Sequence, residues 1–153
     1  MLEKLFGRFT KSNAAEARET DDLPVAVAAL LVEAARADEH YDAHEAALID
    51  KALTAKFELD AAGAAALRAK GEAEQARATD IQRFTRLAKA MSREDKIVLL
   101  EALWEVVLSD GARDAYEDTL MRRICGLIYV DDQDSGAARA RVAARLKPDA
   151  GRS

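Results

Sequence analysis

The sequence predicts an all-α fold, a compact bundle of about seven or eight helices, and three observations support this class. Alanine, leucine, arginine and glutamate form helices readily and are abundant, whereas the 153 residues include only seven glycines and two prolines. Apolar side chains recur at three- and four-residue intervals in successive segments. No segment alternates apolar and polar residues as a half-buried strand does. The chain length suits one compact domain.

Three regions are expected along the chain. Residues 1–22 combine an amphipathic N-terminal segment with a polar linker, because Leu2, Leu5, Phe6 and Phe9 lie at helical spacing and residues 10–22 lack periodicity. Residues 23–147 form the helical domain, and residues 148–153 form a flexible tail. The seven helices of the domain are predicted over about 24–37, 42–57, 60–76, 80–91, 92–108, 114–128 and 137–147.

Most of these helices begin at a residue that suits a helix N-terminus. Pro24 follows two aspartates and is tolerated in a first turn. The next five starts have side chains that accept hydrogen bonds from first-turn amides, in chain order Asp42, Asp60, Thr79 or Asp80, Ser92 and Asp114. The last helix is placed after the polar stretch 129–136 and ends before Pro148, which cannot continue it.

Each predicted helix has apolar positions that can face a common core. The core is expected to be aliphatic, because aromatic residues make up only 5% of the chain, with Trp104 as its largest side chain. The main core positions predicted are Val27, Leu30, Leu31, Ala34, Leu48, Ile49, Leu53, Phe57, Ile81, Phe84, Leu87, Ala88, Met91, Leu100, Leu103, Trp104, Val107, Leu108, Leu120, Met121, Ile124, Cys125, Ile128, Ala138, Val142 and Leu146.

Composition excludes several classes of function. A net charge of −5 argues against a nucleic-acid binder, which needs a concentrated basic surface. The single cysteine, Cys125, allows no internal disulfide and fits a reducing compartment. The apolar runs are too short to span a bilayer, and the N-terminus lacks the features of a signal peptide. We therefore expect a cytoplasmic protein, with residues 1–9 offering a peripheral contact to the inner membrane.

An internal repeat is predicted at an offset of 72 residues. Over the eighteen positions from Leu31 to Leu48, seven residues are identical to those 72 positions later. The matches include three acidic pairs, which are Asp38 with Asp110, Asp42 with Asp114 and Glu45 with Glu117. We expect a helix–joint–helix–helix unit present twice, with the two copies packed about a pseudo-twofold axis.

The acidic residues of the two joints are candidate ligands for a divalent metal ion. Asp110, Gly111, Asp114 and Glu117 match the second half of a calcium-binding EF-hand loop, but Val106 and Leu108 occupy its first two ligand positions. The joints are therefore not EF-hands. The six candidate metal ligands are Asp38, Asp42, Glu45, Asp110, Asp114 and Glu117.

Helix capping is the main alternative for these residues. Asp42 with Glu45, and Asp114 with Glu117, have the spacing of a capping box headed by aspartate. Capping does not explain Asp38 and Asp110, which follow the preceding helices, where the helix dipole disfavours an anion. No nucleophile with an adjacent base and no phosphate-binding loop is evident, so no catalytic residue and no enzymatic activity are predicted.

The segments "LLVEAARADEHYDAHEAALIDKAL" and "ALWEVVLSDGARDAYEDTLMRRI" resemble the TerB-like family. This family includes the tellurite-resistance TerB proteins and the related N-terminal domain of the DjlA co-chaperone. Asp110, Gly111 and Glu117 fit its pattern of an apolar helix, an acidic joint and an acidic helix start, whereas Glu39 departs from the usual glycine. The resemblance covers about residues 23–146. No J domain is recognisable, so the co-chaperone role is not transferred.

The resemblance implies a non-enzymatic helical domain of a bacterial stress, tellurite-resistance or envelope-associated system, which binds a protein partner near the inner membrane. The alternative is a divalent-cation-binding protein that uses the repeated acidic joints. A metal-dependent hydrolase that uses the same carboxylates is the least favoured reading, because capping uses such pairs far more often.

Overall fold

The computed structural model describes residues 22–37, 39, 41–109 and 115–146. These residues form seven α-helices and no strand, which confirms the all-α bundle. The predicted N-terminal helix over residues 1–9, most of the linker and the C-terminal tail lie outside the described residues. The helices are α2 (Leu23–Arg36), α3 (Ala43–Phe57), α4 (Ala61–Arg77), α5 (Gln82–Ala88), α6 (Arg93–Leu108), α7 (Ala115–Ile128) and α8 (Asp132–Leu146).

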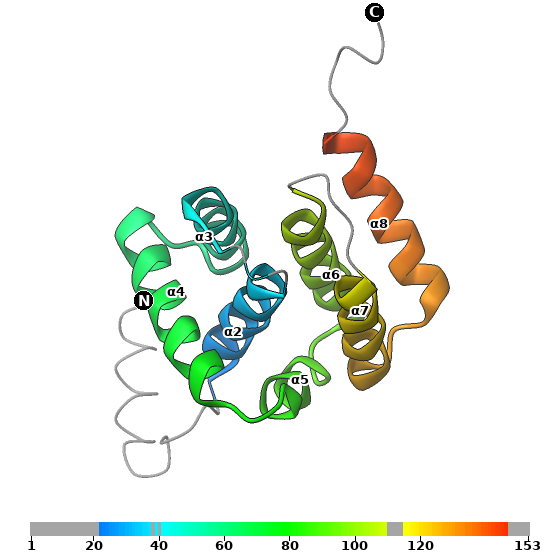
Figure 1. The fold of residues 1–153 in the computed structure, drawn as a ribbon, viewed down its shortest axis with the longest axis horizontal. Coiled ribbons are helices and arrows are strands. Elements are labelled where there is room, and N and C mark those ends of the chain that lie inside the picture. Colours follow the sequence, from blue (N-terminus) through cyan, green and yellow to red (C-terminus); the bar gives the residue numbers. More distant parts are fainter. Residues whose placement is uncertain (1–21, 38, 40, 110–114, 147–153) are drawn as a thin grey trace, which may run out of the picture.

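Helix α2 lies at the centre of the bundle, in contact with α3, α4, α5 and α6 (Figure 1). The sequence predicts a single apolar stripe on this helix. The structure instead buries it on nearly every side, because small alanines and valines fill the positions between the predicted core residues. The buried residues of α2 are Val25, Ala26, Val27, Ala28, Ala29, Leu30, Leu31, Val32, Ala34 and Ala35.

Helices α2 and α4 approach one another closely at Gly71. A Cβ atom added at Gly71 would lie 2.6 Å from the Cβ of Ala28 and 2.8 Å from the backbone carbonyl carbon of Ala28. These distances are too short for non-bonded carbon atoms, so α4 reaches this position only because residue 71 has no side chain. Ala28 supplies the matching small residue on α2.

The second half of the chain packs around α6. Helix α8 contacts α6 along much of its length, α7 contacts α5 and α6, and α7 and α8 meet at few points. Trp104 of α6 is 6% exposed, and its indole Nε1 donates a hydrogen bond to Ser135 Oγ of α8 at 3.2 Å. The prediction that Trp104 belongs to the core is confirmed.

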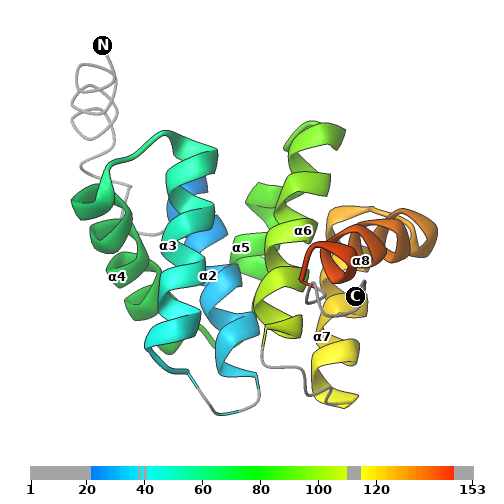
Figure 2. The ribbon, with the colours of Figure 1, turned by 90° about the horizontal axis from the view of Figure 1, so that it is seen from above.

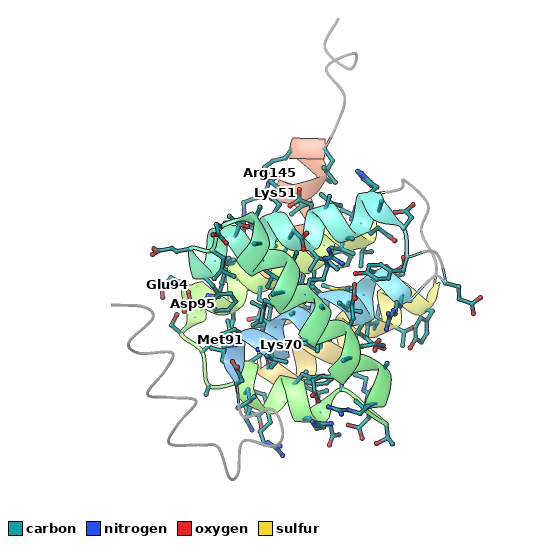
Figure 3. The ribbon with its side chains drawn as sticks, turned by 90° about the vertical axis from the view of Figure 1, so that its left-hand side faces the viewer. Lys51, Lys70, Met91, Glu94, Asp95 and Arg145 are labelled. Atoms are coloured by element: carbon teal, nitrogen blue, oxygen red, sulfur yellow. The ribbon has the colours of Figure 1, made fainter. Side chains whose placement is uncertain are left out.

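Ion pairs connect the two halves at the surface. Lys56 of α3 lies 3.0 Å from Asp95 of α6. Glu105 of α6 pairs with Lys51 of α3 at 3.6 Å and with Arg145 of α8 at 3.9 Å, and Figure 3 shows Lys51 and Arg145 at the same edge of the molecule. Because one partner of each pair is more than half exposed, each pair contributes about 0–1 kcal/mol, and the apolar core holds the halves together.

Local capping determines where most helices begin. Asp42, Asp60 and Ser92 accept hydrogen bonds from the amides of Glu45, Gly63 and Asp95, as predicted. Two predictions of helix bounds are wrong. The fourth helix ends at Ala88 and leaves Met91 outside. The last helix begins at Asp132, because the Asp131 carboxylate accepts a hydrogen bond from the amide of Asp134 at 2.8 Å and caps a turn that was predicted as loop.

The helix bounds follow the predicted 72-residue spacing at two joints. Helices α2 and α6 end at Arg36 and Leu108, and α3 and α7 begin at Ala43 and Ala115. The third pair departs by one residue, because α4 begins at Ala61 and α8 at Asp132. Helices α3 and α7 are each followed by a residue with left-handed backbone, Glu58 and Tyr129. The twofold packing of two equivalent units stays a prediction.

The contact between α4 and α2 predicts opposite effects for two glycine substitutions. Gly71→Ala should lower the free energy of unfolding by about 1–3 kcal/mol, because the new methyl group forces the two backbones apart. Gly126→Ala in α7 should raise it by about 0.5–1 kcal/mol, since nothing lies within 4 Å of that Cβ position and alanine favours the helix. Urea unfolding followed by circular dichroism measures both; equal effects would contradict the close packing at Gly71.

Candidate functional site

The joint between α2 and α3 contains a capping box. The Asp42 carboxylate accepts a hydrogen bond from the Glu45 amide at 3.0 Å, and Glu45 Oε1 accepts one from the Asp42 amide at 3.4 Å. Asp42 is exposed, whereas Glu45 is only 5% exposed. Both predicted site residues therefore stabilise the start of α3, and the capping interpretation is confirmed for this pair.

A polar network ties this joint to α4. Tyr41, which precedes the cap, donates a hydrogen bond from its hydroxyl to Glu72 at 2.5 Å. Arg68 of α4 donates to the same carboxylate at 2.9 Å, and its Nε donates to Asp50 of α3 at 2.6 Å. Burial and the bond to Glu72 raise the pKa of Tyr41 from 10.0 to about 12. Burial opposes ionisation of Glu72, but the hydrogen bonds from Tyr41 and Arg68 lower its pKa overall.

The end of α2 is held by the same helix. The Arg36 guanidinium donates a hydrogen bond to Gln75 of α4, whose amide donates to Glu33 at 2.8 Å. The Arg36 guanidinium also lies 5.2 Å from the centre of the Tyr41 ring, within the range of a cation–π interaction. The residues on both sides of the first joint are thus fixed against α4.

The joint between α6 and α7 places a second buried carboxylate at the start of a helix. Glu117 is 3% exposed, and Ser109 Oγ caps the end of α6 by donating a hydrogen bond to the Val106 carbonyl at 2.9 Å. Figure 2 shows the ends of α2 and α6 and the starts of α3 and α7 at the same end of the bundle. The other three predicted ligands, Asp38, Asp110 and Asp114, lie outside the described residues.

The described part of each joint supplies few ligands for a cation. Asp42 and Glu45 provide one pair of carboxylates at the first joint, and Glu117 provides one carboxylate at the second. Among the described residues, no group of three or more histidine, cysteine, aspartate or glutamate side chains could hold a metal ion. A cation at either joint therefore requires Asp38, Asp110 or Asp114 as further oxygen ligands.

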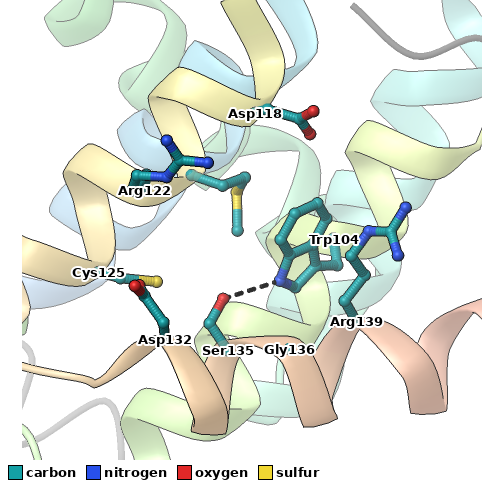
Figure 4. Close-up of a pocket in the computed structure, with 9 residues that line it drawn as sticks. Trp104, Asp118, Arg122, Cys125, Asp132, Ser135, Gly136 and Arg139 are labelled. Carbon is teal, nitrogen blue, oxygen red and sulfur yellow. Dashed lines mark hydrogen bonds between the residues drawn. The ribbon is translucent and has the colours of Figure 1, made fainter. Parts of the chain in front are cut away.

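A pocket of about 310 Å³ opens in the second half of the chain, between α6, α7 and α8. Figure 4 shows the Trp104 ring at its centre, with Arg122 of α7 on one side in this view and Arg139 of α8 on the other. The Arg139 guanidinium lies 5.4 Å from the centre of the Trp104 ring. The residues that line the pocket are Trp104, Asp118, Met121, Arg122, Cys125, Asp132, Ser135, Gly136 and Arg139.

The chemistry of this pocket favours binding over nucleophilic catalysis. Burial and the nearby charge of Asp132 raise the pKa of the Cys125 thiol, and the hydrogen bond with Ser135 only partly offsets them. The thiol is therefore protonated at neutral pH and is a poor nucleophile. The Ser135 hydroxyl accepts the indole hydrogen bond and has no histidine among the residues that line the pocket.

Sequence reasoning missed the pocket. Trp104 and Cys125 were expected in the core, and Arg122, Ser135 and Arg139 were not singled out. These residues come from three helices, and their proximity depends on how α8 packs on α6. One signal was available, because α3 carries an aspartate as its eighth residue, Asp50, whereas α7 carries Arg122 as its eighth residue.

The fold and its acidic joints define a helical-bundle domain with paired acidic helix starts. A family comparison places it further: the family described as tellurite resistance protein TerB matches residues 24–140. The match covers most of the chain, and the chain therefore belongs to the TerB tellurite-resistance family, as the resemblance predicted. Comparisons with curated proteins and with solved structures returned no match.

Not one of α2 to α8 combines the length and the apolar character that crossing a bilayer requires. The predicted contact of residues 1–9 with a membrane surface lies outside the described residues and stays a prediction.

The network around Tyr41 predicts a loss of stability at high pH. Because folding raises the pKa of Tyr41 from 10.0 to about 12, its contribution is fully present below pH 10 and is lost as the pH rises through 12. The difference in unfolding free energy between the wild type and Tyr41→Phe should fall by about 1 kcal/mol over this window, after allowance for solvent screening. Urea titrations at successive pH values measure it. A constant difference would show that Tyr41 titrates identically in both states.

Proposed function

We propose that this domain is a non-enzymatic interaction module of a bacterial tellurite-resistance or stress-response system, and that it binds a protein partner near the inner membrane. Membership of the TerB family supports the assignment to a tellurite-resistance system. The observation that carries the binding role is the composition of the outer face of α7, which we define as Tyr116, Thr119, Arg123, Gly126 and Tyr129.

The outer face of α7 has the residue types that dominate protein interfaces. Tyr116 is 51% exposed and Tyr129, directly after the helix, is 74% exposed. Arg123 lies between them and forms no ion pair with another described residue. Tyrosine and arginine are enriched at protein–protein hot spots, because they bury a large area and also form hydrogen bonds. No exposed large apolar side chain occurs among the described residues before α6.

The chemistry of the described residues supports a non-enzymatic role. Asp42 and Glu45 are used as a capping box, Asp50 and Glu72 are paired with Arg68, and the Cys125 thiol has a raised pKa. Enzymes commonly place titratable groups with shifted pKa values together in a cleft with a base or an acid in reach. Here Arg68, Glu72 and Glu101 form structural ion pairs, and the Cys125 thiol is buried.

A double substitution on the outer face of α7 tests this role. The Arg123→Ala/Tyr129→Ala protein, produced from the native locus, should lower survival on tellurite roughly tenfold or more, because each hot-spot residue contributes about 1–2 kcal/mol to binding. Its thermal melt should stay close to that of the wild type, since both side chains are exposed. Quantitative affinity capture from the membrane and soluble fractions of the host should recover a partner protein with the wild type as bait, and the double variant should fail to recover it.

Arg86→Ala is the matched control, because Arg86 is an exposed arginine of α5 that is not part of the outer face of α7 and forms no ion pair with another described residue. It should leave survival and capture unchanged. A variant that lacks residues 1–10 tests whether this segment brings the complex to the membrane. The partner should then be recovered from the soluble fraction alone. If the double variant and the control capture the same proteins and survive equally, the outer face of α7 is not the partner surface.

Divalent-cation binding is a second candidate function, and the burial of Glu45 and Glu117 favours it. The two glutamates occupy the third residue of α3 and of α7, and both are at most 5% exposed. Burial of a carboxylate is costly unless hydrogen bonds or a cation compensate for the lost hydration. The predicted ligands Asp38, Asp42, Asp110 and Asp114 lie in the joints beside them in the sequence.

Thermal melting after chelator treatment tests this candidate. Calcium, magnesium, manganese or zinc should each be added in turn, and binding predicts a saturable rise of the melting temperature with one of them. The rise should disappear in Asp110→Ala/Glu117→Ala. If no ion changes the melting temperature while the same double substitution lowers it, the acidic residues act as caps, and the cation hypothesis is wrong.

A further inference from the structure

The second helix of each half carries a different residue at the same count from its first residue, whereas the third helices carry the same one. Asp50 and Arg68 are the eighth residues of α3 and α4, and they form a two-point ion pair at 2.6 and 3.3 Å. Arg122 and Arg139 are the eighth residues of α7 and α8. An arginine therefore stands where the first half has the carboxylate, and the second half carries two positive charges in place of an ion pair.

The helices that carry these residues also pack differently in the two halves. Helices α3 and α4 contact one another closely, whereas α7 and α8 meet at few points. The pocket of about 310 Å³ lies where the second pair separates, and both Arg122 and Arg139 line it. Two arginines cannot form an ion pair with one another, so Arg122 and Arg139 do not join their helices as Asp50 and Arg68 do.

Neither arginine has an anionic partner in the described residues. Most other described arginines pair with carboxylates, as Arg83, Arg93 and Arg141 do with Glu74, Asp134 and Glu101. Arg139 contacts the Trp104 ring, and its Nε is buried without a hydrogen-bond acceptor. A buried charged donor that lacks an acceptor costs stability, and an oxygen ligand would satisfy it.

We propose that the pocket binds a small ligand that carries an oxyanion, and that Arg122 and Arg139, which both line it, supply the positive charge that attracts this ligand. The oxyanion takes the part that the Asp50 carboxylate plays toward Arg68 in the first half, because a guanidinium group binds planar and tetrahedral oxyanions through paired N–H donors. Trp104 and Met121 provide apolar walls for the body of the ligand. Asp118 and Asp132 limit the negative charge that the pocket accepts, which favours a single oxyanion over a polyanion.

Trp104 reports directly on this pocket. It is the only tryptophan of the chain, and Arg139 and Ser135 contact its ring and its Nε1. Inorganic phosphate, acetate and tellurite should each be titrated at constant ionic strength, with chloride as the balancing anion, because screening alone also alters charged groups. The three probes distinguish a phosphate ester, a carboxylate and an inorganic oxyanion as the natural source. For tellurite, reversal on dialysis separates binding from reaction with the Cys125 thiol.

Arg122→Gln should weaken the saturable fluorescence change roughly tenfold or more, because it removes a charge-assisted hydrogen bond from the ligand. Arg122→Asp should abolish it, since the new carboxylate supplies the charge that Asp50 supplies in the first half. Arg86→Gln is the matched control: it removes the same charge from an exposed arginine of α5, outside the pocket lining, and should leave the affinity unchanged.

The site is supported if the fluorescence responds saturably to at least one probe, and if this response is weakened in Arg122→Gln and absent in Arg122→Asp. Absence of any response beyond that of chloride, or an equal loss in Arg122→Gln and Arg86→Gln, overturns it. A circular-dichroism melt of each variant confirms that the protein is folded before it is titrated. The site does not depend on the partner surface, because the Arg123→Ala/Tyr129→Ala and Arg122→Gln proteins affect separate readouts.

Discussion

The burial of α2 on nearly every side is the constraint on which the rest of the bundle depends. A helix with no free face needs neighbours in every direction, and α3, α4, α5 and α6 provide them. Such a helix also needs small side chains wherever a neighbouring backbone comes close, as Ala28 does opposite Gly71. Because α6 is one of these neighbours, α2 belongs to the core of both halves, and the cross-half ion pairs of Lys56 and Glu105 only supplement this apolar contact.

Local chemistry explains which parts of the fold could be predicted from the sequence. Asp42, Asp60 and Ser92 cap helices through amides three residues away, so their roles depend on adjacent sequence alone. The start of α8 was placed too late, because "DDQDSG" has the composition of a loop and the cap at Asp131 was not recognised. The complete burial of α2 was not predictable from its pattern, since alanine suits an exposed helix face as well as a buried one.

The candidate sites also differ in whether adjacent sequence or helix packing creates them. The pairing of Asp42 with Glu45 was predicted, because both partners lie in one turn. The pocket was not, because Trp104 and Arg139 lie on different helices and meet only through the packing of α8 on α6. Its charge follows from an exchange of aspartate for arginine at one helical position, and that exchange has meaning only once the helices of the two halves are set side by side. A comparison of the two halves can therefore point to function at a helical position where their residues differ.

Tyr129 combines two properties that compete with one another. Its backbone is left-handed, with φ of 65°, a conformation that disfavours a bulky side chain, and its ring is 74% exposed. Glycine would fit this helix end with less strain, but it would remove the largest exposed aromatic surface of the described residues. Lys89, which lies 5.0 Å from the ring centre, is the neighbour that stabilises the tyrosine there. At this one residue, selection for a more stable fold and selection for a surface that binds a partner more tightly would act in opposite directions.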